Sequence, residues 1–236
     1  MSGPSSRRDE LATNLETVHG RIRAACQDAG RDPGEVSLVV VTKFFPESDI
    51  RLLADLGVRD VGENRHQEAS AKAAACAELG LSWHFIGSIQ SNKAAAVAAY
   101  SDVVESVDRV KLVAGLSRGA GARGRTLDCL VQVSLDPPDS AGRGGAAPGD
   151  VASLAAAISA AEWLRLCGLM AVAPFGQPAL PAFERLAEIA ASLRSDHPDA
   201  RVVSAGMSGD LEEAIRCGAT HVRVGSAVLG PRPGIK

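Results

Sequence analysis

The chain has 236 residues, of which 46% are hydrophobic and 22% are charged, and its formal net charge is −3. This composition excludes an intrinsically disordered chain and is sufficient for a large apolar core. With no basic surplus and only 3% aromatic residues, the chain lacks the features of a nucleic-acid-binding protein.

The cysteines indicate a reducing compartment. There are five, an odd number, and none stands in a Cys-x-x-Cys pair. This pattern argues against a disulfide framework and against a zinc site. The first residues contain no apolar signal core, and no apolar run approaches membrane-spanning length. We therefore expect a cytoplasmic protein that holds no metal and does not enter a membrane. A monomer is the expected state, although no sequence feature argues for it.

The first predicted element is a helix that precedes any strand. Apolar residues recur at helical spacing between Arg8 and Gly30, and Gly30 suits the residue that ends a helix. We expect residues 1–7 to be flexible. Because this helix comes before the first strand, it is an addition to any repeating strand–helix unit.

From residue 37 onward, strand and helix patterns alternate to the end of the chain. The expected strands are Ser37–Thr42, Val58–Gly62, Ser82–Ile86, Asp102–Glu105, Leu127–Val133, Leu164–Met170, Arg201–Ser204 and His221–Val224. The expected helices are Glu47–Leu56, Arg65–Leu79, Ser91–Ala99, Asp108–Gly119, Val151–Ala160, Pro181–Ser195 and Asp210–Cys217. A final turn or short helix follows Gly225.

This pattern predicts an α/β protein with one domain over residues 1–236, a (β/α)₈ TIM barrel with an additional N-terminal helix. Eight is the number of strands that closes such a barrel. The alternative, a doubly wound open sheet, normally has a glycine-rich turn after its first strand. Here the first strand runs into Thr42-Lys-Phe-Phe-Pro46, which contains no glycine, and this favours the barrel.

A long segment rich in glycine and proline covers residues 136–149. Two interpretations remain open for it. It is either a disordered connection or a mobile lid over the strand ends.

Lys43 closes the apolar run of the first strand. If the strands are parallel, it lies at a carboxyl end, where α/β folds carry their chemistry. A lysine beside a low-dielectric wall can lose its proton and attack a carbonyl carbon. The simpler interpretation is a lysine that reaches water at the end of a strand.

Two glycine- and serine-containing loops follow the last two strands, Ser204-Ala-Gly-Met-Ser-Gly-Asp210 and Val224-Gly-Ser-Ala227. In TIM barrels these loops often form a phosphate site with a helix N-terminus. Glycine lets the backbone approach closely, and the hydroxyls of Ser208 and Ser226 can donate hydrogen bonds. Ordinary turn chemistry is the alternative explanation.

Other polar residues lie near the same strand ends. Arg223 shares one strand face with His221 and suits a planar ligand with a polar edge, or else a surface salt bridge. Asn64 ends the second strand and could touch a ligand across the barrel mouth. His84 is either a base or a satisfied core group. Lys93 lies either near the mouth or in solvent.

A reactive lysine, a phosphate-binding cradle and an arginine on one barrel face suit a ligand with an aldehyde and a phosphate, and pyridoxal 5′-phosphate (PLP) has both. Several motifs carry a resemblance to a known family. They are Val41-Thr-Lys43, Gly62-Glu-Asn64, His84-Phe-Ile-Gly-Ser-Ile-Gln-Ser-Asn-Lys93, Gly206-Met-Ser208 and Val222-Arg-Val-Gly225. In this order and spacing, from Leu11 to Arg232, the chain resembles the pyridoxal phosphate homeostasis protein family, whose fold resembles the barrel domain of alanine racemase.

The resemblance implies that Lys43 holds PLP as an internal aldimine. It implies that Ser208, Gly225 and Ser226 hold the phosphate, that Arg223 faces the pyridine nitrogen, and that Asn64 lies by the ring. Met207, within the Gly206-Met-Ser208 motif, is counted with the cofactor-binding residues. No catalytic residue and no firm enzymatic activity are implied. The implied role is intracellular PLP homeostasis, with PLP-dependent apo-enzymes as candidate recipients.

Two alternatives to a role in PLP homeostasis stay open, one an enzyme and the other a barrel that binds a different ligand. An alanine-racemase-like enzyme would need a second base opposite Lys43, but the chain has a single tyrosine, Tyr100, which we expect at the other end of the barrel. An arginine at the ring nitrogen would also leave a weaker electron sink than a carboxylate would. A phosphosugar-binding barrel with a Schiff-base lysine fits the phosphate loops but accounts less well for Arg223 and Asn64.

Overall fold

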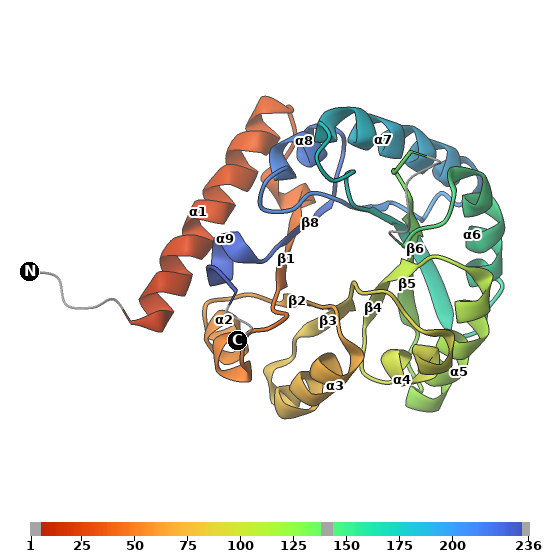
Figure 1. Cartoon of the computed structure of the whole chain (residues 1–236), viewed down its shortest axis with the longest axis horizontal. Helices are drawn as coiled ribbons and strands as arrows, with labels where there is room; N and C mark the ends of the chain where they lie inside the picture. Colours follow the sequence, from red (N-terminus) through yellow and green to blue (C-terminus); the bar gives the residue numbers. More distant parts are fainter. Residues whose placement is uncertain (1–5, 138–143, 233–236) are drawn as a thin grey trace, which may run out of the picture.

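The computed structural model describes residues 6–137 and 144–232, and within them eight parallel strands close into a barrel in sequence order (Figure 1). The strands are β1 Ser37–Val41, β2 Asp60–Glu63, β3 Ser82–Phe85, β4 Val103–Val107, β5 Leu127–Val133, β6 Leu164–Ala171, β7 Val202–Ser204 and β8 His221–Val224. The last strand pairs with the first, with Val39 opposite Arg223. This closure confirms the predicted (β/α)₈ barrel.

Helices surround the barrel. The α-helices are α1 Arg7–Asp28, α2 Glu47–Asp55, α3 His66–Ala75, α4 Ala94–Ala98, α5 Val113–Arg123, α6 Val151–Ser159, α7 Ala179–Asp196, α8 Leu211–Arg216 and α9 Ser226–Leu229. Short 3₁₀ turns are η1 Pro33–Glu35, η2 Ala77–Leu79, η3 Ser91–Lys93, η4 Val110–Leu112 and η5 Pro148–Asp150.

The predicted boundaries are wrong by a few residues in several places. The long alanine-rich helix expected to reach Leu79 ends as α3 at Ala75, because Cys76 leaves the helical region with φ −117° and ψ 21°. The expected helix from Ser91 begins as the 3₁₀ turn η3 before α4. Periodicity finds an element more reliably than its ends, since terminal turns tighten or fray.

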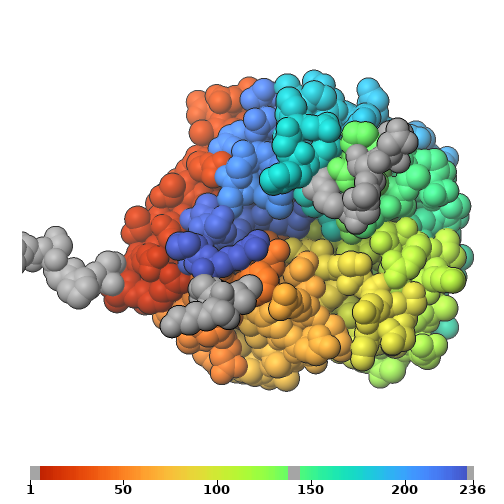
Figure 2. Space-filling view, viewed as in Figure 1, coloured from red at the N-terminus to blue at the C-terminus, as the bar shows by residue number. Residues whose placement is uncertain are grey.

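The additional N-terminal helix α1 packs along the outside of the barrel, beside α8, α9 and α2 (Figure 1). A Ser6 capping box starts it, and its buried side bears the apolar residues that gave the helical spacing. The Asn14 side chain donates to Val228 O at 2.9 Å, and Arg7 donates to Leu229 O at 3.0 Å. Accordingly, the described residues that follow β8, drawn in dark blue, lie against α1 in Figure 2. Residues 1–5 lie outside the described part of the chain.

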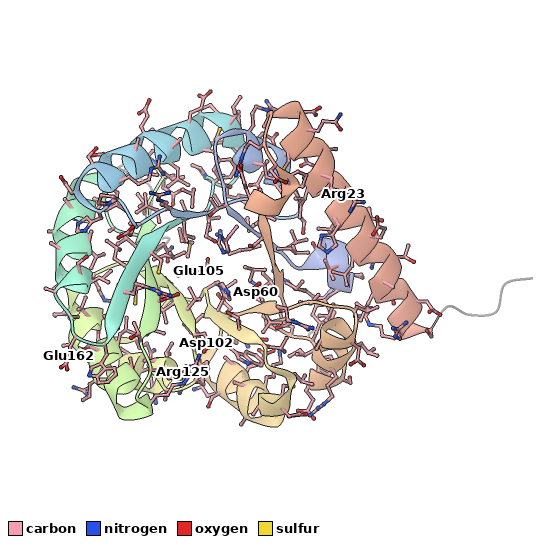
Figure 3. The ribbon with its side chains drawn as sticks, turned by 180° about the vertical axis from the view of Figure 1, so that it is seen from behind. Arg23, Asp60, Asp102, Glu105, Arg125 and Glu162 are labelled. Carbon is pink, nitrogen blue, oxygen red and sulfur yellow. The ribbon has the colours of Figure 1, made fainter. Side chains whose placement is uncertain are left out.

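The barrel interior contains a layer of polar side chains instead of an entirely apolar filling. Asp60 and Glu105 are seen inside the ring of strands in Figure 3. His84 lies between them, 3.2 Å from Asp60 Oδ1 and 2.7 Å from Glu105 Oε1. Buried charged groups are tolerated when they are paired in this way.

The glycine- and proline-rich segment 136–149 is only partly described, since residues 138–143 lie outside the description. Its end is hydrogen bonded to β5. Ser134 N–H donates to Ala146 O at 2.9 Å, and Ala146 N–H donates to Gln132 O at 2.7 Å.

In the described part of the chain, no helix combines the length and the apolar character that a membrane crossing requires.

Candidate functional site

A cavity of about 320 Å³ opens at the carboxyl ends of β1, β7 and β8. Its lining contains six of the seven residues that the sequence singled out for a cofactor: Lys43, Met207, Ser208, Arg223, Gly225 and Ser226. The cavity also has apolar walls, among them Val41, Phe45 and Ile86. A mainly apolar cleft with a few convergent polar groups is the usual form of a small-molecule site.

Lys43 follows β1 directly and is partly buried. No hydrogen bond or ion pair joins its amine to another described residue. Burial lowers the pKa of this amine, the positive charge of Arg232 lowers it further, and Glu63 opposes them. A lowered pKa increases the fraction of uncharged amine at neutral pH, and only the uncharged amine is a nucleophile.

The loops after β7 and β8 meet at one side of this cavity. The Ser226 hydroxyl donates to the Ser208 hydroxyl at 3.3 Å, and Ala227 N–H approaches Ser208 Oγ at 3.4 Å. In α9 the N–H groups of Val228 and Leu229 donate to Gly225 O, so the N–H groups of Ser226 and Ala227 are the ones without a partner inside this helix. Two hydroxyls and these amides form an arrangement that suits a phosphate.

Gly206 allows the first loop to turn toward the barrel. Its φ is +89°, and a Cβ atom there would lie 2.7 Å from the Ala214 Cβ atom. No other residue type fits both restrictions. Met207 N–H then donates to Asp210 Oδ1 at 2.6 Å, which closes the turn that presents Ser208.

Arg21 in α1 holds this loop from outside, a role that sequence reasoning missed. Its guanidinium donates to Ser208 O at 2.9 Å and to both carboxylate oxygens of Glu212 at 2.7 and 2.8 Å. The apolar spacing predicted α1 but not the neighbour that its polar side would meet. Through Arg21, the additional helix α1 therefore supports the loop that presents Ser208 to the cavity.

Arg223 is buried, so the alternative of a surface salt bridge does not apply to it. Its guanidinium donates to Ser204 Oγ at 2.7 Å and to Ala171 O at 2.8 Å. Glu105 lies 3.7 Å away and accepts from Ser204 Oγ at 2.6 Å. These partners fix the plane of the guanidinium below the cavity.

The interior polar layer carries strongly shifted pKa values. Burial disfavours charge on His84, but the bonds and charges of Asp60 and Glu105 raise its pKa to about 9. Burial likewise disfavours the Glu105 carboxylate, yet His84, Arg223 and Ser204 hold its pKa at about 2. His84 is therefore a charged, satisfied core group, and Glu105 is a counterion shared with Arg223.

Asn64 does not line the cavity of Lys43. It lies in an adjacent pocket of about 240 Å³, together with Arg65, His66, Gln90 and Lys93 among others. The β2 end is pressed against the loop after β3, where a Cβ atom on Gly87 would lie 2.0 Å from Asn64 O. Burial lowers the pKa of His66, and the positive charge of Lys93 lowers it further.

Phe44 contacts one arginine from each of the two pockets, Arg232 and Arg65, which sequence reasoning missed. Two guanidinium groups lie over its ring, Arg65 at 5.1 Å and Arg232 at 5.2 Å from the ring centre. Such cation–π contacts hold both charges near the cavity mouth. The same two arginines lower the pKa of Lys43.

Tyr100, the one tyrosine in the sequence, lies away from this cavity. It lines a groove with Trp83, Asp102 and Arg123 near the amino ends of β3 and β4, where Asp102 and Arg125 also lie in Figure 3. Its hydroxyl is 3.4 Å from His66 Nδ1, and burial raises its pKa. It is not placed to act opposite Lys43.

The chain is similar to known proteins over nearly its whole length. The family model described as alanine racemase, N-terminal domain, matches residues 15–233. A protein of Mycobacterium leprae named pyridoxal phosphate homeostasis protein is 43% identical, over 95% of this chain and 94% of the relative. An Escherichia coli protein of the same name is 36% identical, over 95% of this chain and 97% of the relative.

Solved structures agree with the fold. PipY of Synechococcus elongatus, in a structure with PLP bound, superposes with a TM-score of 0.81 at 33% identity, over 93% of this chain and 100% of that one. Alanine racemase from Corynebacterium glutamicum superposes with a TM-score of 0.66 at 16% identity, over 97% of this chain and 62% of that one; at this identity the likeness concerns the fold alone. The chain therefore belongs to the pyridoxal phosphate homeostasis protein family, whose members share the barrel of the alanine racemase N-terminal domain.

Proposed function

We propose that this protein binds PLP and serves in PLP homeostasis by holding the cofactor and supplying it to PLP-dependent apo-enzymes. The observation that carries the proposal is the single cavity wall shared by Lys43, Ser208, Ser226 and Arg223. The relatives named pyridoxal phosphate homeostasis protein and the PLP-bound PipY structure support it. The five free cysteines fit a reducing compartment such as the cytoplasm.

The residues present fit the chemical groups of PLP. Lys43 would supply its uncharged amine to the aldehyde carbon, where a C=N bond forms and one water leaves. Ser208, Gly225 and Ser226 would hold the phosphate, and Arg223 would face the ring nitrogen. When bound, PLP supplies an electron-withdrawing ring conjugated to that C=N bond. Asn64 lines the neighbouring pocket, and its contact with the ring stays a prediction.

The alternative, an amino-acid racemase, is supported less well. Tyr100, the single tyrosine of the sequence, lies in another groove. An arginine stays charged at working pH and cannot give the ring nitrogen a full proton, so the ring would withdraw fewer electrons. Both features favour a protein that holds PLP over one that turns over amino acids.

Absorbance spectroscopy followed by borohydride reduction tests the proposal. We expect the purified protein mixed with PLP to show the absorbance band of a protonated C=N linkage. Reduction and peptide mass mapping should then place a pyridoxyl group on Lys43. Lys43→Ala should lose the adduct, whereas Lys93→Ala, the matched control in the neighbouring pocket, should keep it. A pyridoxyl group on Lys93, or no adduct at all, would contradict the assignment.

A further inference from the structure

The two residues that flank Lys43 are held by one buried polar network. The Thr42 hydroxyl donates to Glu63 Oε1 at 2.6 Å. Phe44 N–H donates to Glu68 Oε1 at 2.7 Å. The turn that carries Lys43 is therefore fixed on both sides by carboxylates from β2 and α3.

Lys72 in α3 joins these carboxylates. Its amine donates to Thr42 O at 2.9 Å, to Glu63 Oε1 at 2.8 Å and to Glu68 Oε1 at 2.6 Å. The Lys72 side chain is 9% exposed and that of Glu63 is 1% exposed. A three-donor ammonium with three short acceptors is fully satisfied, and in a buried environment such bonds are strong.

The network holds a backbone conformation that Phe44 would otherwise avoid. Phe44 has a φ of 71° and is the one residue besides glycine with a positive φ in the described part of the chain. Bulky residues rarely adopt this region unless the surroundings enforce it. The bond from Phe44 N–H to Glu68 is such a constraint, and it acts on the turn that Phe45 N–H closes by donating to Thr42 O at 3.1 Å.

None of the three network residues lines the cavity of Lys43. Glu63 also acts on that amine through its charge, but the three residues can fix the direction of the amine only through the Thr42–Phe44 backbone. We call the bonds of Thr42 and Phe44 to Glu63, Glu68 and Lys72 the clamp. Without the clamp, Phe44 could relax to a negative φ, and the Lys43 side chain could turn toward solvent. The network therefore affects the position of the Lys43 amine, in addition to any effect on the stability of the fold.

We propose that Glu63, Glu68 and Lys72 are positioning residues for Lys43: by clamping Thr42 and Phe44 they aim its amine into the cavity. This inference rests on the proposed function, in which Lys43 forms the bond to PLP. It predicts that loosening the clamp slows bond formation without weakening the phosphate cradle.

The variant Glu68→Ala removes the acceptor of Phe44 N–H and leaves Lys72 paired with Glu63. Glu68→Gln is the rescue variant, because an amide oxygen still accepts that hydrogen bond. Glu188→Ala, an exposed glutamate of α7, is the matched control. Lys72→Met is a second variant that removes the centre of the network.

Three readouts separate positioning from a general loss of structure. Amide hydrogen exchange of Phe44 in the cofactor-free protein reports the clamp. The rate at which the adduct forms at Lys43, measured by borohydride trapping, reports whether the amine is directed into the cavity. Affinity for pyridoxine 5′-phosphate, which has no aldehyde, reports the phosphate and ring contacts without any bond to Lys43.

We expect Glu68→Ala to speed exchange at Phe44 and to slow adduct formation by roughly tenfold to a hundredfold, the scale that a misplaced reactive group costs. Affinity for pyridoxine 5′-phosphate should stay at the wild-type value, and Glu68→Gln should restore most of the rate. Lys72→Met should repeat the slow rate in the fraction that folds.

A wild-type adduct rate in Glu68→Ala would overturn the inference, as would an equal loss of pyridoxine 5′-phosphate affinity. If the wild-type protein forms no adduct, the proposed function fails instead. The exchange measurement distinguishes that case, because it tests the clamp on Phe44 without any cofactor.

Discussion

The hydroxyl oxygens of Ser208 and Ser226 lie 3.3 Å apart, although 18 residues separate them in the sequence. One belongs to the loop after β7 and the other begins α9 after β8. Because β7 and β8 are parallel neighbours, their carboxyl ends bring the two loops together. The pair marks the side of the cavity where a phosphate has the most donors.

Replacing Ser208 should weaken phosphate binding while leaving the barrel folded. One lost hydrogen bond to a charged group is worth about 1.5–3 kcal/mol, or roughly tenfold to a hundredfold in affinity. Calorimetric titration of Ser208→Ala with pyridoxine 5′-phosphate measures the change, with Ser153→Ala in α6 as the control. An unchanged affinity together with a lower melting temperature would mean that Ser208 only stabilises its turn.

Arg21 should affect the same affinity from a distance. Arg21→Ala removes the contacts to Ser208 O and Glu212 and lets the Ser208 loop move. Since Arg21 is partly exposed, we expect a loss of only about 0.5–1.5 kcal/mol, or roughly twofold to tenfold in affinity.

Arg23 provides the matched control for Arg21. It lies in the same helix but pairs with Glu16 on the solvent side, and Figure 3 shows it on the outside of α1. Arg23→Ala should bind pyridoxine 5′-phosphate as the wild type does. Equal affinities for both variants would show that α1 does not support the phosphate loop.

The pH dependence of adduct formation should follow the charge of Lys43. Burial, Arg232 and Arg65 lower the pKa of this amine, so the rate should rise with pH and level off below the ordinary lysine pKa of 10.5. Removing a nearby positive charge stabilises the ammonium form. Arg232→Ala should therefore move the inflection to higher pH and slow the reaction at neutral pH.

Stopped-flow absorbance between pH 6 and 10 measures this shift, with Arg216→Ala on α8 as the control for a lost surface charge. An inflection that moves downward, or that moves equally in both variants, would contradict the role assigned to Arg232.

Loss of the α-proton from alanine should be slow in the wild-type protein loaded with PLP. Arg223 can donate to the ring nitrogen but cannot protonate it, so the ring remains a weak electron sink. Deuterium exchange at the α-carbon of L- and D-alanine measures this step. Exchange or racemisation at ordinary enzyme rates of about 1–1000 per second would favour the racemase alternative.

A carboxylate at position 223 should speed the exchange. Because Glu105 is 3.7 Å from Arg223, Arg223→Glu alone would place two carboxylates together in the barrel. The double variant Arg223→Glu with Glu105→Gln avoids this repulsion and keeps the number of buried carboxylates unchanged. No increase over Glu105→Gln alone would show that Arg223 does not limit the ring chemistry.

The sequence by itself determined the barrel and the place of the main candidate residues. Apolar strands alternating with helices are local patterns, and eight such units close in sequence order. Strand alternation put Arg223 on the face of His221, and parallel strands put Lys43 and the two serine loops at one end. These inferences succeeded because each depends only on chain periodicity and on the common direction of the strands.

Only the tertiary structure decided which distant side chains meet. Arg21 reaches Ser208 O across 187 residues, and Lys72 reaches Thr42 O from a different element. Asn64, expected by the ring, lies in the neighbouring pocket, and Phe44 takes a conformation that no propensity indicates. Such contacts depend on how helices pack against the barrel, and long polar side chains have too many rotamers for sequence spacing to fix their partners.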